Sequence, residues 1–203
     1  MAEAALLHLA SGSPRRREIL AALGVPHTWE GPDVDETPTA AEPAEQLALR
    51  LAVAKATASR ATGAGRRIIL GADTVVTLDG RVFGKAGSED EALDMLSQLS
   101  GRTHKVITAV ALLTREREFT AVSQSNVSLR QIEPAEARAY WRSGEPLGKA
   151  GAYAIQGVGG IFIESLSGSY SCVVGLPVFE TAALLREVGI DLLPPDASAR
   201  GVR

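Results

Sequence analysis

The sequence predicts an α/β fold with a mixed sheet. Short apolar runs with the character of strands alternate along the chain with longer runs that have helical periodicity. Asp79-Gly80 is a strong two-residue hairpin turn, and the strand-like runs 104–113 and 119–129 are joined by a short charged turn. Two hairpins within a chain of alternating strands and helices indicate a mixed sheet rather than a purely parallel one.

The first helix has clear boundary signals. Residues 6–10 are short and apolar, as in a buried strand. Ser13 is a suitable N-cap, and Pro14 suits the first position of a helix. We therefore expect a helix over residues 14–23, with Gly24 ending it.

The later elements are predicted by the same kinds of signal. Branched residues favour strands, and alanine and leucine in helical spacing favour helices. A capping box, Ser88-Glu89-Asp90-Glu91, marks one helix start. In order, we expect an acidic loop at 31–38, a helix at 41–62 closed by Gly63-Ala64-Gly65, a strand at 68–78 that returns as 81–85, a helix from 88 to 101, strands at 104–113 and 119–129, a helix from 134 to 144, short β segments in the glycine-rich stretch 148–176, and a helix from 177 to about 189.

Length and composition set broad limits on the class of protein. The chain has 203 residues, 45% hydrophobic and 22% charged, which is enough for one domain at 1–190, with two lobes around a cleft, and a loose tail at 191–203. The net charge of −3 argues against broad nucleic-acid binding. No apolar run approaches about 18 residues, so we expect no membrane span. A single cysteine and the lack of a signal peptide pattern predict a cytoplasmic protein.

Three arginines occupy the start of the first helix. Arg15, Arg16 and Arg17 oppose the partial positive charge of the helix N-terminus, where acidic residues are favoured. An anion held by free backbone N–H groups and guanidinium groups would explain them, which suggests a phosphate site. The alternative is a surface helix with solvated arginines.

One carboxylate interrupts the apolar strand at 68–78. An isolated charge there is costly, so Asp73 needs a partner, a metal or a water-filled cleft. The hairpin register predicts Thr74 opposite Lys85, which would place Lys85 beside Asp73. Two interpretations remain open: a local Asp–Lys ion pair, or an acid or metal ligand next to a phosphate-binding lysine.

Other polar residues are weaker candidates. The loop carboxylates Asp33, Asp35 and Glu36 suit magnesium or manganese, although an acidic loop is often only solvated. Lys55 has the alternative of an ordinary surface lysine. Gln156 lies between glycines and can offer one donor and one acceptor to a base edge. Strand-like residues follow this segment, so it is not a dinucleotide fingerprint, and residues 144–149 do not match a Walker loop. The three histidines lack metal spacing, and a thiol mechanism is disfavoured for Cys172.

Taken together, several motifs resemble the Maf family of nucleoside triphosphate pyrophosphatases. The resemblance covers about residues 5–190 in the family's order. The Ile155-Gln156-Gly157 segment is similar to the branch that hydrolyses dTTP and UTP, and Ser171-Cys172 is a small departure from the usual pattern. The motifs are Ala10-Ser-Gly-Ser-Pro-Arg-Arg, Val34-Asp-Glu, Gly71-Ala-Asp-Thr-Val-Val, Gly84-Lys85, Gly101 to Val106 followed by Thr108, Ala150-Gly-x-Tyr-x-Ile-Gln-Gly, and Gly168-Ser-Tyr through Gly175-Leu-Pro.

The resemblance implies an elongated, twisted mixed sheet flanked by helices, in a Maf/ITPase-like fold. It also favours a homodimer. It implies hydrolysis of the triphosphate to a monophosphate and pyrophosphate with a divalent cation, Mg or Mn. In that branch, the positions matching Arg15, Thr74 and Gln156 are associated with substrate choice. The implied roles are catalytic for Asp73 and Lys85, substrate-binding for Ser11, Ser13, Arg15, Arg16, Lys55, Thr74 and Gln156, and metal-binding for Glu36 and Asp73.

Two other functions remain open at this point. The chain could be a nucleotide-binding regulator of cell division, with incidental hydrolysis, because the family was once described in terms of septum formation. It could also be a nucleotidyltransferase, since the same phosphate contacts serve a different acceptor. Asp73 as the group that orients or deprotonates water favours the hydrolase.

Overall fold

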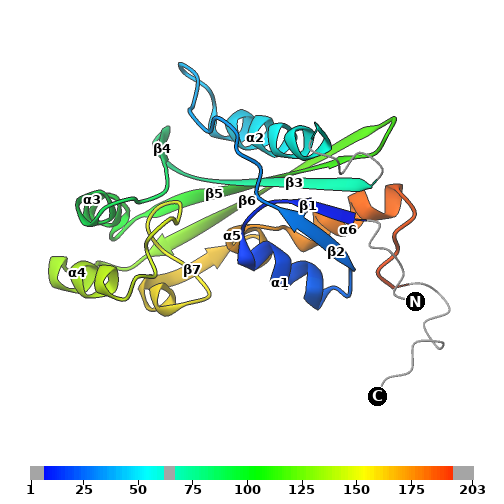
Figure 1. Ribbon diagram of the computed structural model, residues 1–203. Helices are drawn as coiled ribbons and strands as arrows, with labels where there is room; N and C mark the ends of the chain where they lie inside the picture. The colour runs from blue at the N-terminus through cyan, green and yellow to red at the C-terminus, as the bar shows by residue number, and fades with distance from the viewer. Residues whose placement is uncertain (1–6, 62–66, 194–203) are drawn as a thin grey trace.

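The computed structural model describes residues 7–61 and 67–193 (Figure 1). Strands and helices alternate along much of the chain. The elements are β1 (Leu7–Ala10), α1 (Pro14–Ala22), β2 (His27–Glu30), α2 (Ala44–Ser59), β3 (Ile68–Leu78), β4 (Arg81–Phe83), α3 (Glu89–Leu99), β5 (Thr103–Leu113), β6 (Glu118–Leu129), α4 (Pro134–Arg142), the 3-10 helix η2 (Val158–Phe162), β7 (Ile163–Ser167), α5 (Tyr170–Val174) and α6 (Val178–Glu187).

Within the described residues, seven strands form one mixed sheet, which confirms the predicted α/β class. The main order is β2-β1-β3-β5-β6-β7, and β4 pairs with β3 beside this path. β1 is parallel to both β2 and β3, whereas β3, β5, β6 and β7 form antiparallel pairs. The long hairpin strands β5 and β6 carry the sheet from one end of the molecule to the other (Figure 1).

The edge of β3 that faces β1 contains a gap. β1 pairs with β3 up to Gly71, and β4 pairs with it only from Val76 onward. Because β5 occupies the other edge of β3 throughout this stretch, both shorter strands share one edge. Residues 72–75 therefore have no strand beside them on that edge among the described residues. The gap leaves the middle of β3 open to side chains from other elements.

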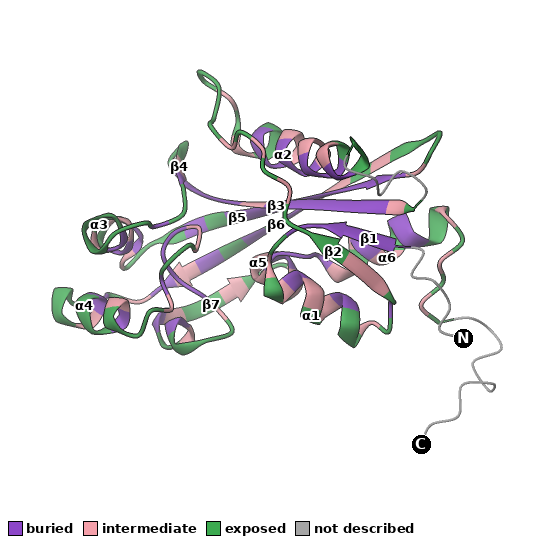
Figure 2. Ribbon diagram, viewed as in Figure 1, coloured by how far each residue is buried: buried purple, intermediate pink, exposed green. Residues whose placement is uncertain are grey.

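Alternation along β3 and β5 divides the core between the two faces of the sheet. α2 covers one face, where Leu51 and Ala52 pack with Val75 and Ile107 (Figures 1 and 2). On the opposite face one apolar cluster, which we call the first cluster, gathers around α3 and α4 at one end of the strands. The second cluster gathers around α1 and α6 at the other end. The first cluster includes Val76, Leu96, Leu99, Val106 and Val127, and the second includes Leu7, Leu20, Leu70, Val110 and Leu185.

A polar row separates these two clusters. Thr74, Thr108 and Ser123 are paired in register across β3, β5 and β6. Thr108 donates to the carbonyl oxygen of Cys172 in α5 at 2.7 Å, so this short helix docks on the row. The row therefore lies at the same level of the sheet as the gap.

Most of the predicted elements agree with the structure to within a few residues, but the register prediction for Lys85 is wrong. β4 ends at Phe83, and Lys85 instead forms an isolated bridge with Ala150 from a distant loop. The glycine-rich stretch contains β7, but also the helices η2 and α5. These helices were not predicted, because the stretch is rich in turn-forming residues. β2 was not predicted, because His27–Glu30 is a half-exposed edge strand with little apolar character.

One other detail differs from expectation, at the start of α1. Ser13 occupies the N-cap of α1, yet its side chain makes no capping hydrogen bond. Instead, Oγ of Ser11 accepts a hydrogen bond from the Ser13 N–H at 3.2 Å. The predicted Gly63-Ala64-Gly65 stop and most of the tail from 191 lie outside the described residues. No helix in the described ranges is long and apolar enough to cross a membrane.

Candidate active site

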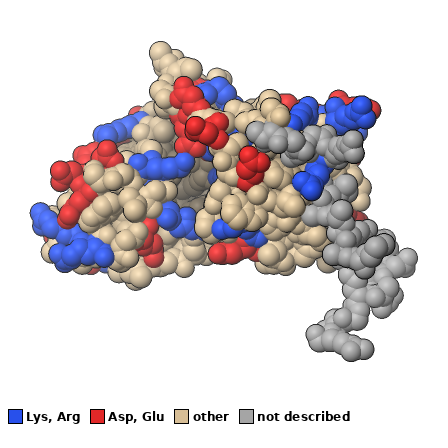
Figure 3. Space-filling view, in the orientation of Figure 1, with Lys and Arg blue, Asp and Glu red and all other residues tan. Residues whose placement is uncertain are grey.

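A cavity of about 440 Å³ opens at the gap in the sheet edge. Its walls come from the loop after β1, the middle of β3, the residues after β4 and the loop 148–156. Figure 3 shows this hollow near the centre of the molecule, with acidic and basic side chains on its rim. All the predicted site residues line it: Ser11, Ser13, Arg15, Arg16, Glu36, Lys55, Asp73, Thr74, Lys85 and Gln156.

A close approach between α2 and β3 places Lys55 over Asp73. A Cβ atom at Gly71 would lie only 2.2 Å from the carbonyl oxygen of Ala52, so only glycine fits there. Lys55 follows Ala52 by about one helical turn, and Asp73 follows Gly71 on the same face of the strand. Both side chains are buried, and Lys55 Nζ lies 2.6 Å from Asp73 Oδ1. Lys55 is therefore not the ordinary surface lysine that was its alternative.

Glu36 extends this ion pair into a chain of four charges. Its Oε1 lies 2.6 Å from Lys55 Nζ, and its Oε2 accepts from Lys85 Nζ at 2.5 Å. Burial opposes ionisation of Glu36, but the hydrogen bonds from the two lysines outweigh it and lower its pKa to about 2. Lys85 thus reaches Asp73 through Glu36 and Lys55 rather than directly. Two carboxylates and two ammonium groups balance each other at this wall of the cavity.

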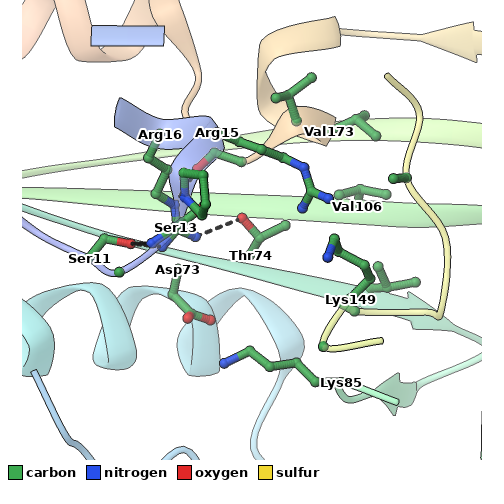
Figure 4. Close-up of a pocket in the computed structure, with 18 of the residues that line it drawn as sticks. Ser11, Ser13, Arg15, Arg16, Asp73, Thr74, Lys85, Val106, Lys149 and Val173 are labelled. Carbon is green, nitrogen blue, oxygen red and sulfur yellow. Dashed lines mark hydrogen bonds between the residues drawn. The ribbon is translucent and has the colours of Figure 1, made fainter. Parts of the chain in front are cut away.

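The side chain of Arg16 reaches from α1 into the gap at the edge of β3. Its guanidinium donates to the carbonyl oxygens of Ala72 at 2.8 Å and Gly175 at 2.7 Å. It also donates to Ser11 Oγ at 3.0 Å and Thr74 Oγ1 at 3.1 Å (Figure 4). Four of its five N–H groups are therefore used within the protein. Arg16 holds the floor of the cavity, with at most one N–H left for a ligand.

The hydroxyl of Thr74 is also committed to the protein. Thr108 gives its only hydroxyl proton to the Cys172 carbonyl, so in the Thr74–Thr108 contact of 2.9 Å Thr74 is the donor. Thr74 accepts from Arg16 at the same time. Toward a ligand, this hydroxyl can therefore act only as an acceptor.

Arg15 and Lys149 form a second wall, which we call uncompensated because neither side chain forms an ion pair with a described carboxylate. Figure 4 shows both side chains directing their charged ends into the cavity, across from Asp73 and Lys85. Arg15 makes no hydrogen bond to any described residue, and Lys149 Nζ donates only to the Leu147 carbonyl at 3.1 Å. Burial, together with the charge of Arg15, lowers the pKa of Lys149. This wall favours binding of an anion.

Lys149 was not predicted as a site residue. Its segment was considered only as a Walker loop and rejected on spacing. The structure brings it to the cavity through backbone pairing, since Ala86 N–H donates to the Lys149 carbonyl and Gly148 N–H to the Ala86 carbonyl. A positive charge among glycines, unexplained by any helix or strand, was the one available signal.

Several other polar residues lie away from the cavity. Arg17 stacks on Trp29, with 4.0 Å from its guanidinium carbon to the ring centroid, so the third arginine differs from the first two. Asp35 accepts from the Thr37 N–H in the exposed loop, and of the three loop carboxylates only Glu36 reaches the cavity. The ring of His104 contacts the hydroxyl of Tyr153 at 2.7 Å, and Cys172 is buried.

The donor set at the cavity suits a divalent cation such as Mg²⁺ or Mn²⁺. Glu36 and Asp73 supply hard oxygen ligands, and Asp73 Oδ2 accepts no hydrogen bond from the described residues. No group of three or more His, Cys, Asp or Glu side chains gathers in those ranges to enclose an ion. The residues therefore fit an ion held by one or two carboxylates that completes its shell with water and phosphate oxygens.

Comparisons with known proteins give one matching family and several relatives. The family model described as Maf-like protein matches residues 6–188. A protein of Alkalilimnicola ehrlichii named dTTP/UTP pyrophosphatase is 48% identical over 190 residues, which cover 91% of this chain and 94% of that protein. A Methylococcus capsulatus protein of the same name is 47% identical, covering 93% and 94%. A Haemophilus ducreyi protein named nucleoside triphosphate pyrophosphatase is 43% identical, covering 93% and 98%.

Proposed function

This chain belongs to the Maf family, and we propose that it hydrolyses dTTP and UTP to the nucleoside monophosphate and pyrophosphate. The observation that carries the proposal is the pairing of two unlike walls in one cavity. One wall holds the balanced chain Asp73–Lys55–Glu36–Lys85, and the other holds the uncompensated cations Arg15 and Lys149. The names of the relatives support the choice of substrate.

The uncompensated wall serves to bind the triphosphate. Arg15 and Lys149 neutralise phosphate oxygens without first breaking an internal ion pair. The first-turn N–H groups of α1 lie at the same cavity, because a helix leaves its first donors without internal partners. Ser11 and Ser13 line the cavity on either side of Gly12 at this helix start. Positioning and charge neutralisation are the main requirements of phosphoryl transfer.

We assign the activation of water to Asp73. Its Oδ1 is held by Lys55, which leaves Oδ2 to accept a proton. The water oxygen attacks the α-phosphorus, the bond from that phosphorus to the bridging oxygen breaks, and pyrophosphate leaves. When bound at Glu36 and Asp73, a divalent cation would supply Lewis-acid polarisation of the phosphate. Lys55 contacts both carboxylates, and Lys85 contacts Glu36, so the two lysines hold these groups in place.

We assign base recognition to Gln156, with Thr74 as a second contact. The Gln156 carboxamide can accept from N3–H and donate to O4 of uracil or thymine. Thr74 offers an acceptor only, for the reason given above. The homodimer, the cytoplasmic location and the lack of nucleic-acid binding stay predictions.

The decisive experiment is product analysis with UTP and dTTP. The purified protein with Mg²⁺ or Mn²⁺ should release pyrophosphate and monophosphate, resolved by anion-exchange chromatography. Asp73→Asn should lower kcat by about 100-fold or more, because it removes the proton acceptor. Asp94→Asn, a change at an exposed residue of α3, should leave kcat unchanged.

Four results would contradict this function or the role assigned to Asp73. Full activity in Asp73→Asn would remove the assigned base, and release of diphosphate plus inorganic phosphate would exclude attack at the α-phosphorus. Tight nucleotide binding with negligible turnover would instead support the regulator of cell division. Formation of a sugar nucleotide from UTP and a sugar phosphate would identify a transferase.

A further inference from the structure

The glycines around Gln156 are explained by two side chains of the α4 region. A Cβ atom at Gly157 would lie 2.1 Å from Glu145 Oε2, and one at Gly159 would lie 2.3 Å from the Tyr140 hydroxyl. The space that a side chain would need is therefore filled by Glu145 and Tyr140. The glycines at 157 and 159, which do not form a dinucleotide fingerprint, leave room for these two side chains.

Glu145 and Tyr140 bind the loop on both sides of Gln156. On the far side, Glu145 accepts from the N–H groups of Val158 and Gly159, both at 2.9 Å. On the near side, the Tyr140 hydroxyl accepts from the buried Ala154 N–H at 3.1 Å. Tyr140 in turn donates to Glu145 Oε1 at 2.6 Å, which joins the two ends. The loop 154–159 is thus held at three backbone points by one connected pair.

The charge of the same carboxylate also acts on Arg15. Burial alone would raise the pKa of Glu145, but its three hydrogen bonds and the charge of Arg15 lower it below its usual value. Glu145 is therefore charged near neutral pH and attracts the Arg15 guanidinium. Arg15 and Gln156 come from distant parts of the chain, and Glu145 interacts with the side chain of one and the backbone beside the other.

We propose that Tyr140 and Glu145 are positioning residues that set the selectivity of the cavity for uracil and thymine. The proposal rests on the proposed function and deepens it. A freely moving Gln156 carboxamide can rotate to present its donor or its acceptor, so it cannot by itself distinguish uracil from cytosine. A loop held in one place prevents the cavity from adjusting to cytosine or to a larger purine.

Kinetics with three nucleotides tests this role. We would measure kcat/KM for UTP, CTP and ATP in Glu145→Gln and in Tyr140→Phe, which keeps the ring that packs against Phe162. The ratio of UTP to CTP, and of UTP to ATP, should fall by about tenfold in both variants, because a loosened loop costs the correct substrate most. Glu136→Gln is the matched control, since Glu136 lies on α4 and pairs with Arg130 without lining the cavity. It should leave both ratios unchanged.

Amide hydrogen exchange gives a second readout that needs no catalysis. Exchange at residues 154–160 of the nucleotide-free protein should be faster in Glu145→Gln than in the wild type and in Glu136→Gln. An equal loss of kcat/KM for all three nucleotides, or unchanged exchange in this loop, would overturn the positioning role. Failure of the wild-type protein to hydrolyse any nucleotide would contradict the proposed function alone, because the exchange experiment would still report on the loop.

Discussion

At the scale of single residues, neighbouring arginines on α1 have unlike environments. Arg16 is 8% exposed and makes hydrogen bonds to Ser11, Ala72, Thr74 and Gly175. Arg15, one position earlier, points into the cavity with no hydrogen bond to any described residue (Figure 4). The first is committed to the architecture, and the second is available to a ligand. The unfavourable position of each arginine near the helix N-terminus is therefore offset differently. Arg16 is stabilised by hydrogen bonds within the protein, and Arg15 by the phosphate that we propose it binds.

This difference predicts unequal effects of two identical substitutions. Arg16→Lys should lower the free energy of unfolding by about 3 kcal/mol, because an ammonium cannot replace the planar set of donors and leaves buried carbonyls unpaired. Arg15→Lys should change it by less than about 0.5 kcal/mol. Urea denaturation measures both. Equal losses in the two variants would contradict the assignment of Arg16 to the architecture.

At the scale of elements, the spacing between α2 and β3 decides whether the charged chain can form. Ala48, Ala52 and Ala56 give α2 a narrow buried face, and Gly71 lets it approach the strand. These alanines and Gly71, which have small side chains or none, thus bring Lys55 and Asp73 into contact within a buried layer. The contact between Lys55 and Asp73 therefore depends on residues that have no reactive side chain themselves.

Replacement of Gly71 tests this dependence. In Gly71→Ala the added Cβ would meet Ala52 and Ala56, so α2 must move away from β3. We expect a loss of about 2 kcal/mol in the free energy of unfolding and a clear fall in kcat, as Lys55 withdraws from Asp73. Gly84→Ala is the control, because a Cβ there meets no atom within 4 Å. Wild-type activity in Gly71→Ala would show that the approach is not needed.

Local signals in the sequence were enough for the elements but not for all of the site. The Asp79-Gly80 turn and the register of Val76 with Phe83 follow from neighbouring residues, and both are found. The partner of Lys85 could not be derived locally, since Ala150 reaches it only through the fold. The burial of Lys55 likewise depends on Gly71, and the position of Lys149 on the backbone of Ala86. Spacing along the sequence does not reveal contacts between distant segments.

At the scale of the whole molecule, the long strands β3 and β5 run through both apolar clusters and the polar row between them. Leu96 belongs to the first cluster and Leu185 to the second, and both are fully buried. The cavity lies between the clusters and takes residues from elements that pack against each. Because β3 and β5 are continuous, they connect the two ends of the described fold.

This continuity predicts one cooperative unfolding transition. Leu96→Ala and Leu185→Ala should each lower the free energy of unfolding by about 2–5 kcal/mol, with a single transition seen by both circular dichroism and Trp fluorescence. An exposed residue, Leu193→Ala, serves as the control and should have little effect. Two separated transitions in either core variant would mean that the ends unfold independently.

The gap in the sheet has a further consequence for solubility. An unpaired strand edge is a template on which strands of other chains can add, and it promotes aggregation. Here the open stretch is limited to residues 72–75, with β1 and β4 on either side of it. Its Ala72 carbonyl is already occupied by Arg16. A side chain thus takes one of the positions that a neighbouring strand would fill, which shortens the open edge available to another polypeptide.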